Sequence, residues 1–530
     1  MLKDKFFDRE NHLEILKKRI SDLKYGYRQN IAIIGDELIG KTSLIFKLIN
    51  QFYDNYIIIL YLEIRSETIS TFVKRFIGVL LYNFLINSDT SLKEDLDFLI
   101  KKSEKYIPKT TEKIRLILNA LERRKTEDIF SELLSLCELI HEESGKFCII
   151  IWDEFHNLES IGIKNLYREW SKLLISQKNT LYIIISSQKF KAQLILSKHL
   201  SLLFGNFQII SVEPFDIKTS EEFIENRLNG FNLDLGLRNF IVHFTGGWPL
   251  YLELITEAVL KTKETNLVDI LENLLFEPLG ILNQRFSSYL KRLLDNPYHH
   301  DYMMILYLIA SGHNKIKDIS RILHKQNKQL SLIINRLLEL DIITKNGDFL
   351  KINDRVFSFW LRFVYQAKQH SLTFDAKNQR DLFRNYIETL IKEFLFNSQK
   401  SVTERLIELL HLFENERLQI GRKKLKLSHF REIKPLEFNC RNFKNGLICR
   451  SNESLWILAL KQDLLTEDDI VEFVNECKRY RRKLDKKIII TLQDIDTNAQ
   501  LRALEEKILT LNLENLNQLF DIFYKPRIII

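Results

Sequence analysis

The sequence predicts an α/β fold in which a parallel sheet is followed by helical regions and then by a second α/β region. Two observations support this prediction. In residues 1–213, short apolar runs alternate with longer stretches of helical periodicity, an order that is typical of βαβ units. These apolar runs also lack polar alternation, as expected for strands that are buried on both faces of a parallel sheet.

Residues 1–213 are expected to form the sheet-containing core. The predicted elements, in chain order, are helix 10–25, strand 31–34, helix 42–52, strand 57–63, a long helical stretch at 70–144, and strands 148–152, 181–186 and 208–212. The chain then changes character at Pro214, where strand-like runs give way to helical patterns.

Three further regions follow this core. Residues 214–295 are interpreted as a helical lid, residues 296–370 as a winged helix and residues 371–530 as a second α/β domain, because three helices and a hairpin describe a winged helix. The elements behind this division are helices 220–228, 235–245 and 250–263; helices 302–310, 316–323 and 329–340 with a hairpin of 342–344 and 349–352; and helices 381–396, 402–413 and 467–484 with strands 446–450, 455–461 and 487–492.

The composition fits a globular protein of several domains. Hydrophobic residues make up 45% of the 530 residues, and Lys+Arg (78) exceed Asp+Glu (70) only mildly, which is compatible with nucleic-acid binding but does not indicate it. The five cysteines form no C-x-x-C pair, so we expect neither a disulfide framework nor a structural zinc site. The first residues carry charge, and the apolar runs are too short to cross a membrane, so we expect a cytoplasmic protein without a membrane partner.

The segment after the first predicted strand fits the phosphate-binding pattern G-x-x-x-x-G-K-[ST]. Its residues are Gly35, Asp36, Glu37, Leu38, Ile39, Gly40, Lys41, Thr42 and Ser43. In this pattern the glycines let backbone N–H groups face a phosphate, Lys41 reaches the β and γ oxygens, and the Thr42 hydroxyl ligates Mg²⁺. A strand before the pattern and a helix after it distinguish it from a chance match in a loop. The sequence therefore predicts a P-loop NTPase core that binds Mg-ATP.

Two carboxylates follow the third predicted strand. We assign Asp153 to the Mg²⁺ shell and Glu154 to the catalytic base that polarises the attacking water, and we expect Asp153 on the strand adjacent to the P-loop strand. The alternative is a strand end with ordinary solvated acids, and the upstream P-loop favours the catalytic interpretation. Ser186 and Ser187 end the next strand, where a hydroxyl could contact the γ-phosphate or the water, although serine there is commonly a turn residue. We include Ser186 among the catalytic candidates.

These motifs resemble the archaeal-type ATPases of the STAND class, within the AAA+-related P-loop NTPases. The resemblance covers about residues 6–366 and rests on the order of the motifs. They are Phe7-Asp8-Arg9-Glu10, the P-loop at 35–43, Asp153-Glu154, Glu213-Pro214-Phe215, Gly246-Gly247-Trp248-Pro249 and the stretch from Asp354 to Trp360. The resemblance implies an ATP-driven switch in which Arg9 and Pro249 line the adenine pocket. Without it, Pro249 would be interpreted only as a helix start.

The chain departs from this family at one catalytic position. The family often has Gly-Arg before the fifth strand, and that arginine would act on the γ-phosphate, whereas this chain has Gly205-Asn206. Loss of such a cation can slow hydrolysis by ~10³ or more, so turnover is expected to be slow or to need another arginine. Arg168 and Arg227 are both candidates.

The last region resembles the PD-(D/E)xK nuclease-like domain of the same ATPases, in a degenerate form. Lys461 matches the motif lysine, but Ala459 stands where a glutamate is needed and Gly446 falls near the expected aspartate. Since carboxylates must hold the metal ion, no nuclease activity is expected.

The partners remain open at the level of sequence. Basic runs at 422–426 and 478–483, together with Lys328, Arg336 and Lys345 of the winged helix, could bind DNA, or they could be solvated faces. We expect a slow ATPase that acts as a nucleotide-dependent switch for DNA, for a protein partner or for another copy of itself. The alternative is a DNA-binding regulator whose ATP site is mainly structural, and a nuclease or motor is a third, less favoured, reading.

Overall fold

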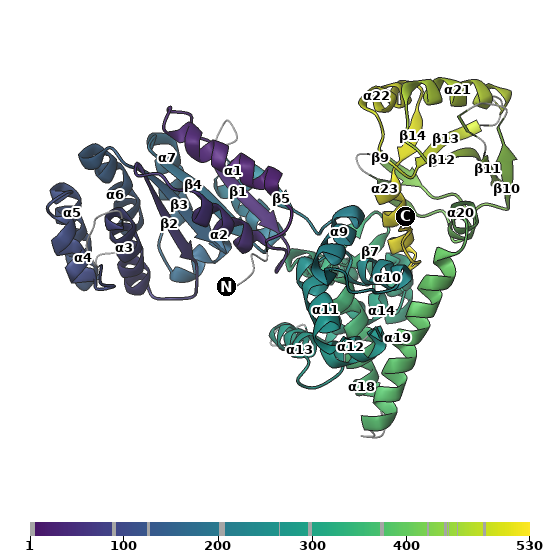
Figure 1. The fold of residues 1–530 in the computed structure, drawn as a ribbon, viewed down its shortest axis with the longest axis horizontal. Coiled ribbons are helices and arrows are strands. Elements are labelled where there is room, and N and C mark those ends of the chain that lie inside the picture. The colour runs from purple at the N-terminus through teal and green to yellow at the C-terminus, as the bar shows by residue number, and fades with distance from the viewer. Residues whose placement is uncertain are drawn as a thin grey trace. The chain divides into compact units, whose positions relative to one another are not determined.

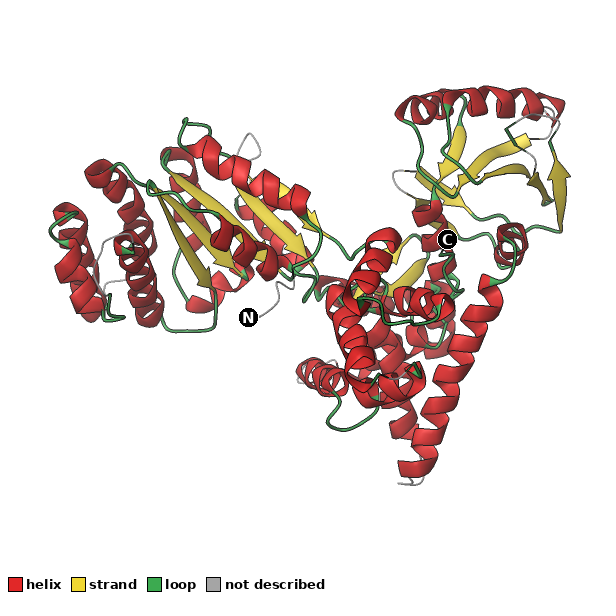
Figure 2. Cartoon of the chain, in the orientation of Figure 1, coloured by secondary structure: helices red, strands yellow, loops and turns green. Residues whose placement is uncertain are grey.

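The structure is a computed structural model of the chain. It describes residues 6–529 except 87–91, 125–127, 201–206, 264, 295–298, 371–375, 421–422, 439–441, 444, 453 and 481–483. By their contacts, the residues divide into two compact units. The first unit comprises 1–215 together with Trp248–Leu250, and the second comprises Asp216–Gly247 and Tyr251–Ile530. Figure 1 labels the elements of both units, and Figure 2 distinguishes helices from strands.

Within the described residues, the first unit contains a five-stranded sheet in the order β2-β3-β4-β1-β5. All neighbouring strands are parallel. The strands are β1 (Asn30–Gly35), β2 (Ile57–Glu63), β3 (Phe147–Asp153), β4 (Thr180–Ser186) and β5 (Phe207–Val212), within one or two residues of the predicted positions. The expectation that Asp153 lies on the strand next to the P-loop strand is wrong, because β4 separates β3 from β1.

Helices cover both faces of this sheet. Helices α1 (Glu10–Leu23) and α2 (Lys41–Gln51) pack against β4 and β1, respectively. On the other face, alternate strand residues such as Ala32 and Leu60 join a large apolar core with α3 (Ile69–Leu85), α6 (Ile129–Ser144) and α7 (Leu166–Ser176). The inner strands β1 and β4 are therefore buried on both sides, as their continuous apolar sequences predict, whereas the edge strand β5 is partly exposed.

The long helical stretch expected at 70–144 is interrupted. It is divided into α3, α4 (Leu96–Ser103), α5 (Pro108–Glu122) and α6. Asp95 caps α4 by accepting a hydrogen bond from the Phe98 backbone N–H, and Pro108 occupies the first turn of α5. Aspartate at an N-cap and proline in the first turn both favour a new helix start.

The second unit begins with helices and includes the elements expected for a winged helix. The helices are α9 (Ile217–Leu228), α10 (Leu235–Thr245), α11 (Pro249–Thr262), α12 (Leu267–Leu275), α13 (Ile281–Leu294), α14 (His299–Ala310), α15 (Ile316–Leu323) and α16 (Asn327–Glu339). Strands β6 (Ile343–Asn346) and β7 (Phe349–Ile352) then form an antiparallel hairpin, and α17 (Arg355–Trp360) follows.

A second hairpin covers the tip of the β6–β7 hairpin. Strands β8 (Arg417–Ile420) and β9 (Lys423–Lys426) were not predicted. Asp348 donates its backbone N–H to the Arg417 carbonyl oxygen at 2.9 Å, and a Cβ atom placed on Gly347 would lie 1.9 Å from that oxygen. Since Gly347 also has φ +61°, the tip requires glycine for both conformation and close approach.

The chain ends in a second sheet, which has the order β10-β11-β12-β13-β14 among the described residues. Its strands are β10 (Glu432–Glu437), β11 (Asn445–Arg450), β12 (Leu455–Lys461), β13 (Leu484–Thr491) and β14 (Ile508–Leu511), with helices α19 (Ala376–Ser398), α20 (Val402–Leu410), α21 (Glu467–Cys477), α22 (Thr497–Glu505) and α23 (Leu513–Ile522) nearby in sequence. The helix expected at 467–484 ends early, because β13 begins at Leu484. Among the described residues, no helix is both long enough and apolar enough to span a membrane.

Candidate nucleotide-binding site

The predicted P-loop connects the end of β1 to the start of α2. Its two glycines have different reasons to be glycine. A Cβ atom on Gly35 would lie 2.3 Å from the Val212 carbonyl oxygen of β5, whereas Gly40 adopts φ +97°, which side chains with a Cβ disfavour. Between them, Ile39 is fully buried and anchors the loop, while Glu37 and Leu38 are exposed, as is Ser43 beyond the loop on α2. The close approach to β5 and the buried Ile39 side chain therefore fix the position of the loop on the sheet.

Lys41 turns back into the loop. Its ammonium donates hydrogen bonds to the Gly35 carbonyl oxygen at 3.0 Å and to the Asp36 carbonyl oxygen at 2.6 Å, and the residue is only 5% exposed. Burial lowers the pKa of Lys41, and the nearby Glu154 and Asp153 carboxylates oppose this change. The ammonium therefore lies inside the loop, where an incoming phosphate would gain a charged donor.

Asp153 is the last residue of β3, and its carboxylate meets the start of α2. One oxygen, Oδ2, accepts hydrogen bonds from the Thr42 hydroxyl at 3.0 Å and from the Tyr61 hydroxyl at 2.7 Å. A carboxylate and a hydroxyl oxygen that converge in this way are the donor types that Mg²⁺ prefers. Within the described chain, no group of three or more His, Cys, Asp or Glu side chains could hold a metal ion, so the two oxygens would need phosphate and water to complete the shell.

The Glu154 carboxylate is held by the end of β4. Its Oε2 accepts hydrogen bonds from the Ser187 backbone N–H at 3.0 Å and from the Ser187 hydroxyl at 2.8 Å. The residue has φ +53°, a left-handed conformation that directs the chain into the following 3₁₀ turn. Burial raises the pKa of Glu154, whereas the bonds from Ser187 lower it. The carboxylate is close to the loop but is engaged by another residue.

Ser186 occupies a different position from the one expected. Its side chain is fully buried, and its hydroxyl pairs with His156 Nδ1 at 2.8 Å and donates to the Gln188 carbonyl oxygen at 3.1 Å. The serine that contacts the candidate base is Ser187. Burial lowers the pKa of His156 to about 4, so its imidazole is neutral near pH 7, and its Nδ1 lies 3.2 Å from Glu154 Oε2.

Arg9 and Pro249 both belong to the first unit. Arg9 donates from its guanidinium to the Glu213 carbonyl oxygen at 2.6 Å and to the Ile39 carbonyl oxygen at 3.5 Å, and it lies 5.1 Å from the Phe215 ring centroid. It therefore links the P-loop to the segment after β5. Pro249 is the first residue of α11, and contacts place Trp248–Leu250 with the first unit, although the chain before and after these three residues belongs to the second.

The two candidates for a catalytic arginine belong to different units. Arg168 is exposed on α7 of the first unit, and Arg227 of the second unit forms an ion pair with Glu253 at 2.8 Å. Asn206 lies outside the described residues. A cation that does lie at the loop is Lys189, whose ammonium is 2.8 Å from an Asp36 carboxylate oxygen.

Sequence reasoning missed Tyr61, His156 and Lys189. Each belongs to a segment that lies near the P-loop only because of the order of the strands in the sheet, which the sequence does not reveal. The only signal in the sequence was position: Tyr61 is near the end of β2, and the other two follow β3 and β4. Parallel strands collect their carboxyl ends at one edge, so polar residues there are candidates for the site.

At the region compared with a nuclease, small residues occupy the positions where carboxylates would be needed. Gly446 pairs with Ala459 across β11 and β12, and Ala459 lies in an apolar cluster with Phe473. A Cβ atom on Gly446 would lie 2.2 Å from the Phe438 ring. The Lys461 ammonium pairs with the buried Asp469 carboxylate, which caps α21.

Comparison with known proteins agrees with this geometry. Residues 6–255 match the model of a family described as an ATPase domain predominantly from Archaea. No curated protein matches the sequence significantly. The parallel sheet, the P-loop and this match define the class, an ATP-binding ATPase domain of the P-loop type. Within that class, residues 6–255 are similar to the archaeal family.

Solved structures show weaker likenesses. The Walker-type ATPase PABY2304 of Pyrococcus abyssi is 20% identical with a TM-score of 0.49, and the match covers 68% of this chain and 97% of that chain. The ORC2 protein of Aeropyrum pernix, in its ADPNP–ADP complexes, is 11% identical with a TM-score of 0.38, and the match covers 72% of this chain and 95% of that chain. TM-scores below 0.5 support no conclusion about the function of this chain.

Proposed function

We propose that the chain hydrolyses ATP slowly with Mg²⁺ and acts as a nucleotide-dependent switch. The observation that carries this proposal is the convergence of Lys41 and Thr42, from the start of α2, with Asp153 and Glu154, from the end of β3. Lys41 would bind the β and γ oxygens, Thr42 and Asp153 would hold Mg²⁺, and Glu154 would orient and deprotonate the attacking water. When bound, Mg²⁺ would neutralise phosphate charge.

The surroundings of Glu154 support slow hydrolysis. A general base must be within hydrogen-bond reach of its water, but here two bonds from Ser187 hold the carboxylate. Both bonds engage Oε2, so nucleotide binding would have to release this oxygen before it could accept a proton from the water, whereas Oε1 receives no bond from Ser187. The two arrangements of this carboxylate would give the switch its two states, and the helical lid, winged helix and C-terminal domain would carry the change to a partner.

Turnover measurements test this proposal. ATP hydrolysis would be measured for the wild type and for Glu154→Gln, with and without duplex DNA, and limited proteolysis would follow residues 214–300 with and without ATP. We expect slow turnover in the wild type, and we expect Glu154→Gln to reduce it at least ~10²-fold while nucleotide binding is retained. We also expect ATP to change the rate at which the protease cleaves within residues 214–300. Equal turnover in both proteins would refute the assigned base, and nucleotide-independent cleavage would refute the switch.

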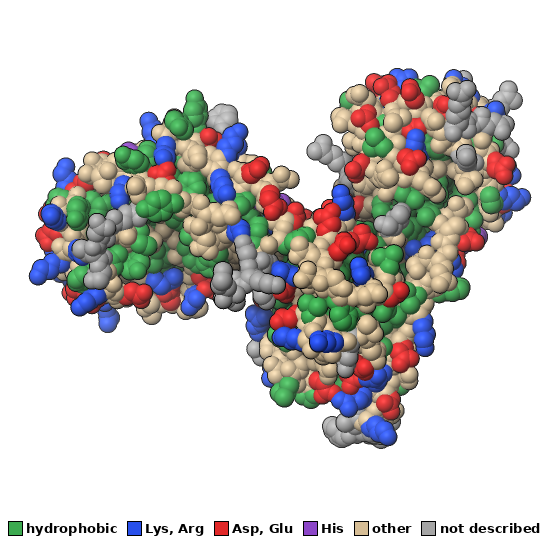
Figure 3. Space-filling view, viewed as in Figure 1, with side chains coloured by type: hydrophobic (Ala, Val, Ile, Leu, Met, Phe, Trp, Pro, Cys, Tyr) green, Lys and Arg blue, Asp and Glu red, His purple; other side chains and the backbone are tan. Residues whose placement is uncertain are grey.

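A second candidate is a DNA-binding regulator whose ATP site is mainly structural. It is favoured by α16, on which Lys328, Gln329, Asn335 and Arg336 are exposed. Such side chains are suited to contacts with phosphates and base edges. The neighbouring wing is covered by β8–β9, and on the face drawn in Figure 3 basic side chains are interspersed with acidic ones. In this case Lys41→Ala would bind duplex DNA with unchanged affinity and salt dependence, whereas an ATP switch predicts that both change.

A further inference from the structure

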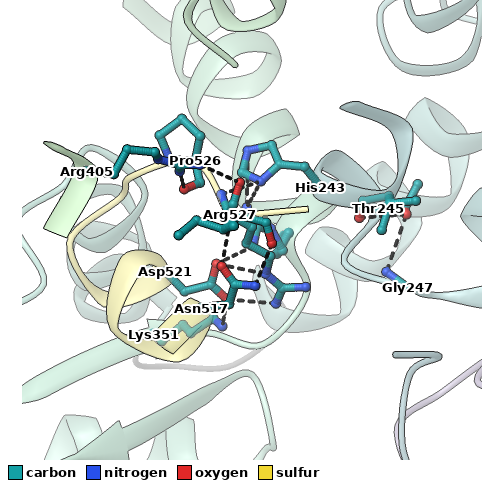
Figure 4. Close-up of polar contacts among 12 residues, drawn as sticks. His243, Thr245, Gly247, Lys351, Arg405, Asn517, Asp521, Pro526 and Arg527 are labelled. Atoms are coloured by element: carbon teal, nitrogen blue, oxygen red, sulfur yellow. Dashed lines mark hydrogen bonds and ion pairs between the residues drawn. The ribbon is translucent and has the colours of Figure 1, made fainter. Parts of the chain in front are cut away.

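A buried carboxylate in the second unit gathers cations from three separate segments. The side chain of Asp521 on α23 is only 2% exposed, and its oxygens lie 2.8 Å from the Lys351 ammonium of β7 and 2.8 Å from the Arg527 guanidinium of the C-terminal segment. Arg355 of α17 donates to the same carboxylate. Figure 4 shows the side chains of Asp521, Lys351 and Arg527 converging, with His243 of α10 beside them.

The charges in this cluster do not balance. Among the described residues, Lys351, Arg355 and Arg527 share the single carboxylate of Asp521. His243 adds no negative charge, and burial lowers its pKa so far that the ring is neutral near pH 7. An excess of positive charge in a poorly solvated place is unfavourable unless an anion compensates it.

A cavity of about 420 Å³ opens onto the same cations. Lys351 and Arg355 line it, and 37% and 22% of their side-chain surfaces, respectively, are exposed. Arg362 and Lys525 also line the cavity, and neither forms an ion pair within the described part of the chain. The lining cations thus outnumber the lining carboxylates, which are Asp521 and Glu393.

The remaining wall of the cavity is largely aromatic. Phe359, Phe363, Tyr386 and Tyr524 line it. The Arg362 guanidinium lies 4.7 Å from the Phe363 ring centroid, so this cation is next to an aromatic ring of the wall. A flat apolar group could pack on these rings while an anionic group meets the cations, because ligand pockets combine apolar walls with a few charged groups in this way.

We propose that this cavity binds a small organic phosphate, with the phosphate toward Arg355, Arg362 and Lys351 and an aromatic or other flat apolar body on the phenyl and phenol rings. Guanidinium groups bind phosphate in a bidentate manner, and several cations at one place favour phosphate over a single carboxylate. The volume is in the range of pockets that bind drug-sized ligands, roughly 300–1,000 Å³. The site is separate from the P-loop and does not depend on ATP hydrolysis.

Calorimetric titration of the full chain tests this proposal. The titrations contain no nucleotide, because ADP is itself an organic phosphate with a flat base and would compete for the cavity. Lys41→Ala is titrated in parallel, so that binding at the P-loop is distinguished from binding at the cavity, and the probes are phenyl phosphate, inorganic phosphate and phenol. The variant is Arg362→Ala, chosen because the side chain is exposed and its loss should not unfold the chain. The matched control is Arg321→Ala on α15, whose side chain is 78% exposed and pairs with Asp318 away from the cavity lining.

We expect one equivalent of phenyl phosphate to bind, inorganic phosphate to bind more weakly and phenol to show no binding. Arg362→Ala should weaken phenyl phosphate binding by about tenfold or more, whereas Arg321→Ala should change it less than about twofold. The proposal is overturned if phenyl phosphate does not bind the wild type, or if Arg362→Ala binds it equally well. If inorganic phosphate binds as tightly as phenyl phosphate, the proposed contact between an apolar group and the rings is refuted. If phenol binds as tightly as phenyl phosphate, the proposed contact between a phosphate and the cations is refuted.

Discussion

Asp153 and Glu154 show how two neighbouring carboxylates acquire different environments. Asp153 accepts hydrogen bonds from Thr42 and Tyr61, while Glu154 is held by Ser187 and its pKa is raised by burial. The motif predicts both acids, because their order after an apolar strand is a local property of the sequence. It does not predict Tyr61 or Ser187, because these contacts arise only when β2 and β4 are placed on either side of β3.

Ser187→Ala tests the restraint on Glu154 at the scale of a single hydroxyl. Hydrogen bonds to an ionised carboxylate lower its pKa, so removing the Ser187 hydroxyl should raise the pKa of Glu154 further above its ordinary value of 4.5. If ionised Glu154 is the base, turnover falls as pH falls through this pKa. The acid limb of the kcat profile should therefore move to higher pH, by about one unit for a bond of that kind.

Ser171→Ala is the control for this measurement. Ser171 is half-buried on α7, and among the described residues its hydroxyl donates to the Arg168 carbonyl oxygen within its own helix. The pH profile of Ser171→Ala should therefore match that of the wild type. An unshifted acid limb in Ser187→Ala would separate Glu154 from the rate-limiting proton transfer.

The strands of the first sheet were predictable because each is a continuous apolar run. The separate helices between β2 and β3 were harder to predict, because the helical periodicity continues past their ends. Only capping residues such as Asp95 indicate where a new helix begins. In the C-terminal region, β8, β9 and β10 are short and rich in charged residues, so nothing in their sequences distinguishes them from loops. Their pairing partners, not their composition, make them strands.

A pair of glycine substitutions tests how closely β1 and β5 must approach. Gly35→Ala would place a methyl group 2.3 Å from the Val212 carbonyl oxygen, which is backbone and cannot rotate away. We expect the free energy of unfolding to fall by about 1–3 kcal/mol, and we expect nucleotide binding to be lost. Denaturant unfolding and calorimetric titration with ADP measure the two effects.

Gly78→Ala should raise the free energy of unfolding, in contrast to Gly35→Ala. Gly78 lies within α3, and a Cβ atom there would have no neighbour within 4 Å, so alanine should stabilise the helix by about 0.5–1 kcal/mol. If both variants were equally stable, the close approach of β1 and β5 would not explain Gly35.

At the scale of the whole molecule, the second unit depends on contacts between segments that are far apart in sequence. Asp521 meets Lys351 across 170 residues, and the Asn314 side chain donates a hydrogen bond to the Ile522 carbonyl oxygen across 208 residues. Neither arrangement could be predicted, because single charged residues in α23 and β7 look like ordinary surface positions. The match to the family model covers nearly all of the first unit but only the beginning of the second, because it ends at residue 255.

Asp521→Asn should strongly destabilise the second unit. Removing the charge leaves three buried or half-buried cations without a partner, for an expected loss of about 3–5 kcal/mol in the free energy of unfolding at pH 7. Burial opposes the ionisation of Asp521, but Arg355, Lys351 and Arg527 outweigh it and hold its pKa well below 3.8. The stabilisation is therefore complete above about pH 3.8 and is lost as pH falls through the lower folded pKa.

Denaturant unfolding across this pH range measures the effect. The control is Asp318→Asn, which removes a solvent-exposed ion pair with Arg321 and should change the free energy of unfolding by less than about 1 kcal/mol. Similar losses in the two variants would mean that the Asp521 cluster stabilises no more than a surface pair.

The return of Trp248–Leu250 to the first unit has a practical consequence for dissecting the gene. The first unit is not one uninterrupted stretch of polypeptide, so a truncation after Phe215 removes three of its residues, including Pro249. A truncation after Leu250 keeps them but carries helices α9 and α10 without the rest of their unit. No single stop codon yields the first unit alone and intact, and fragments designed from its sheet would be cut in the wrong place.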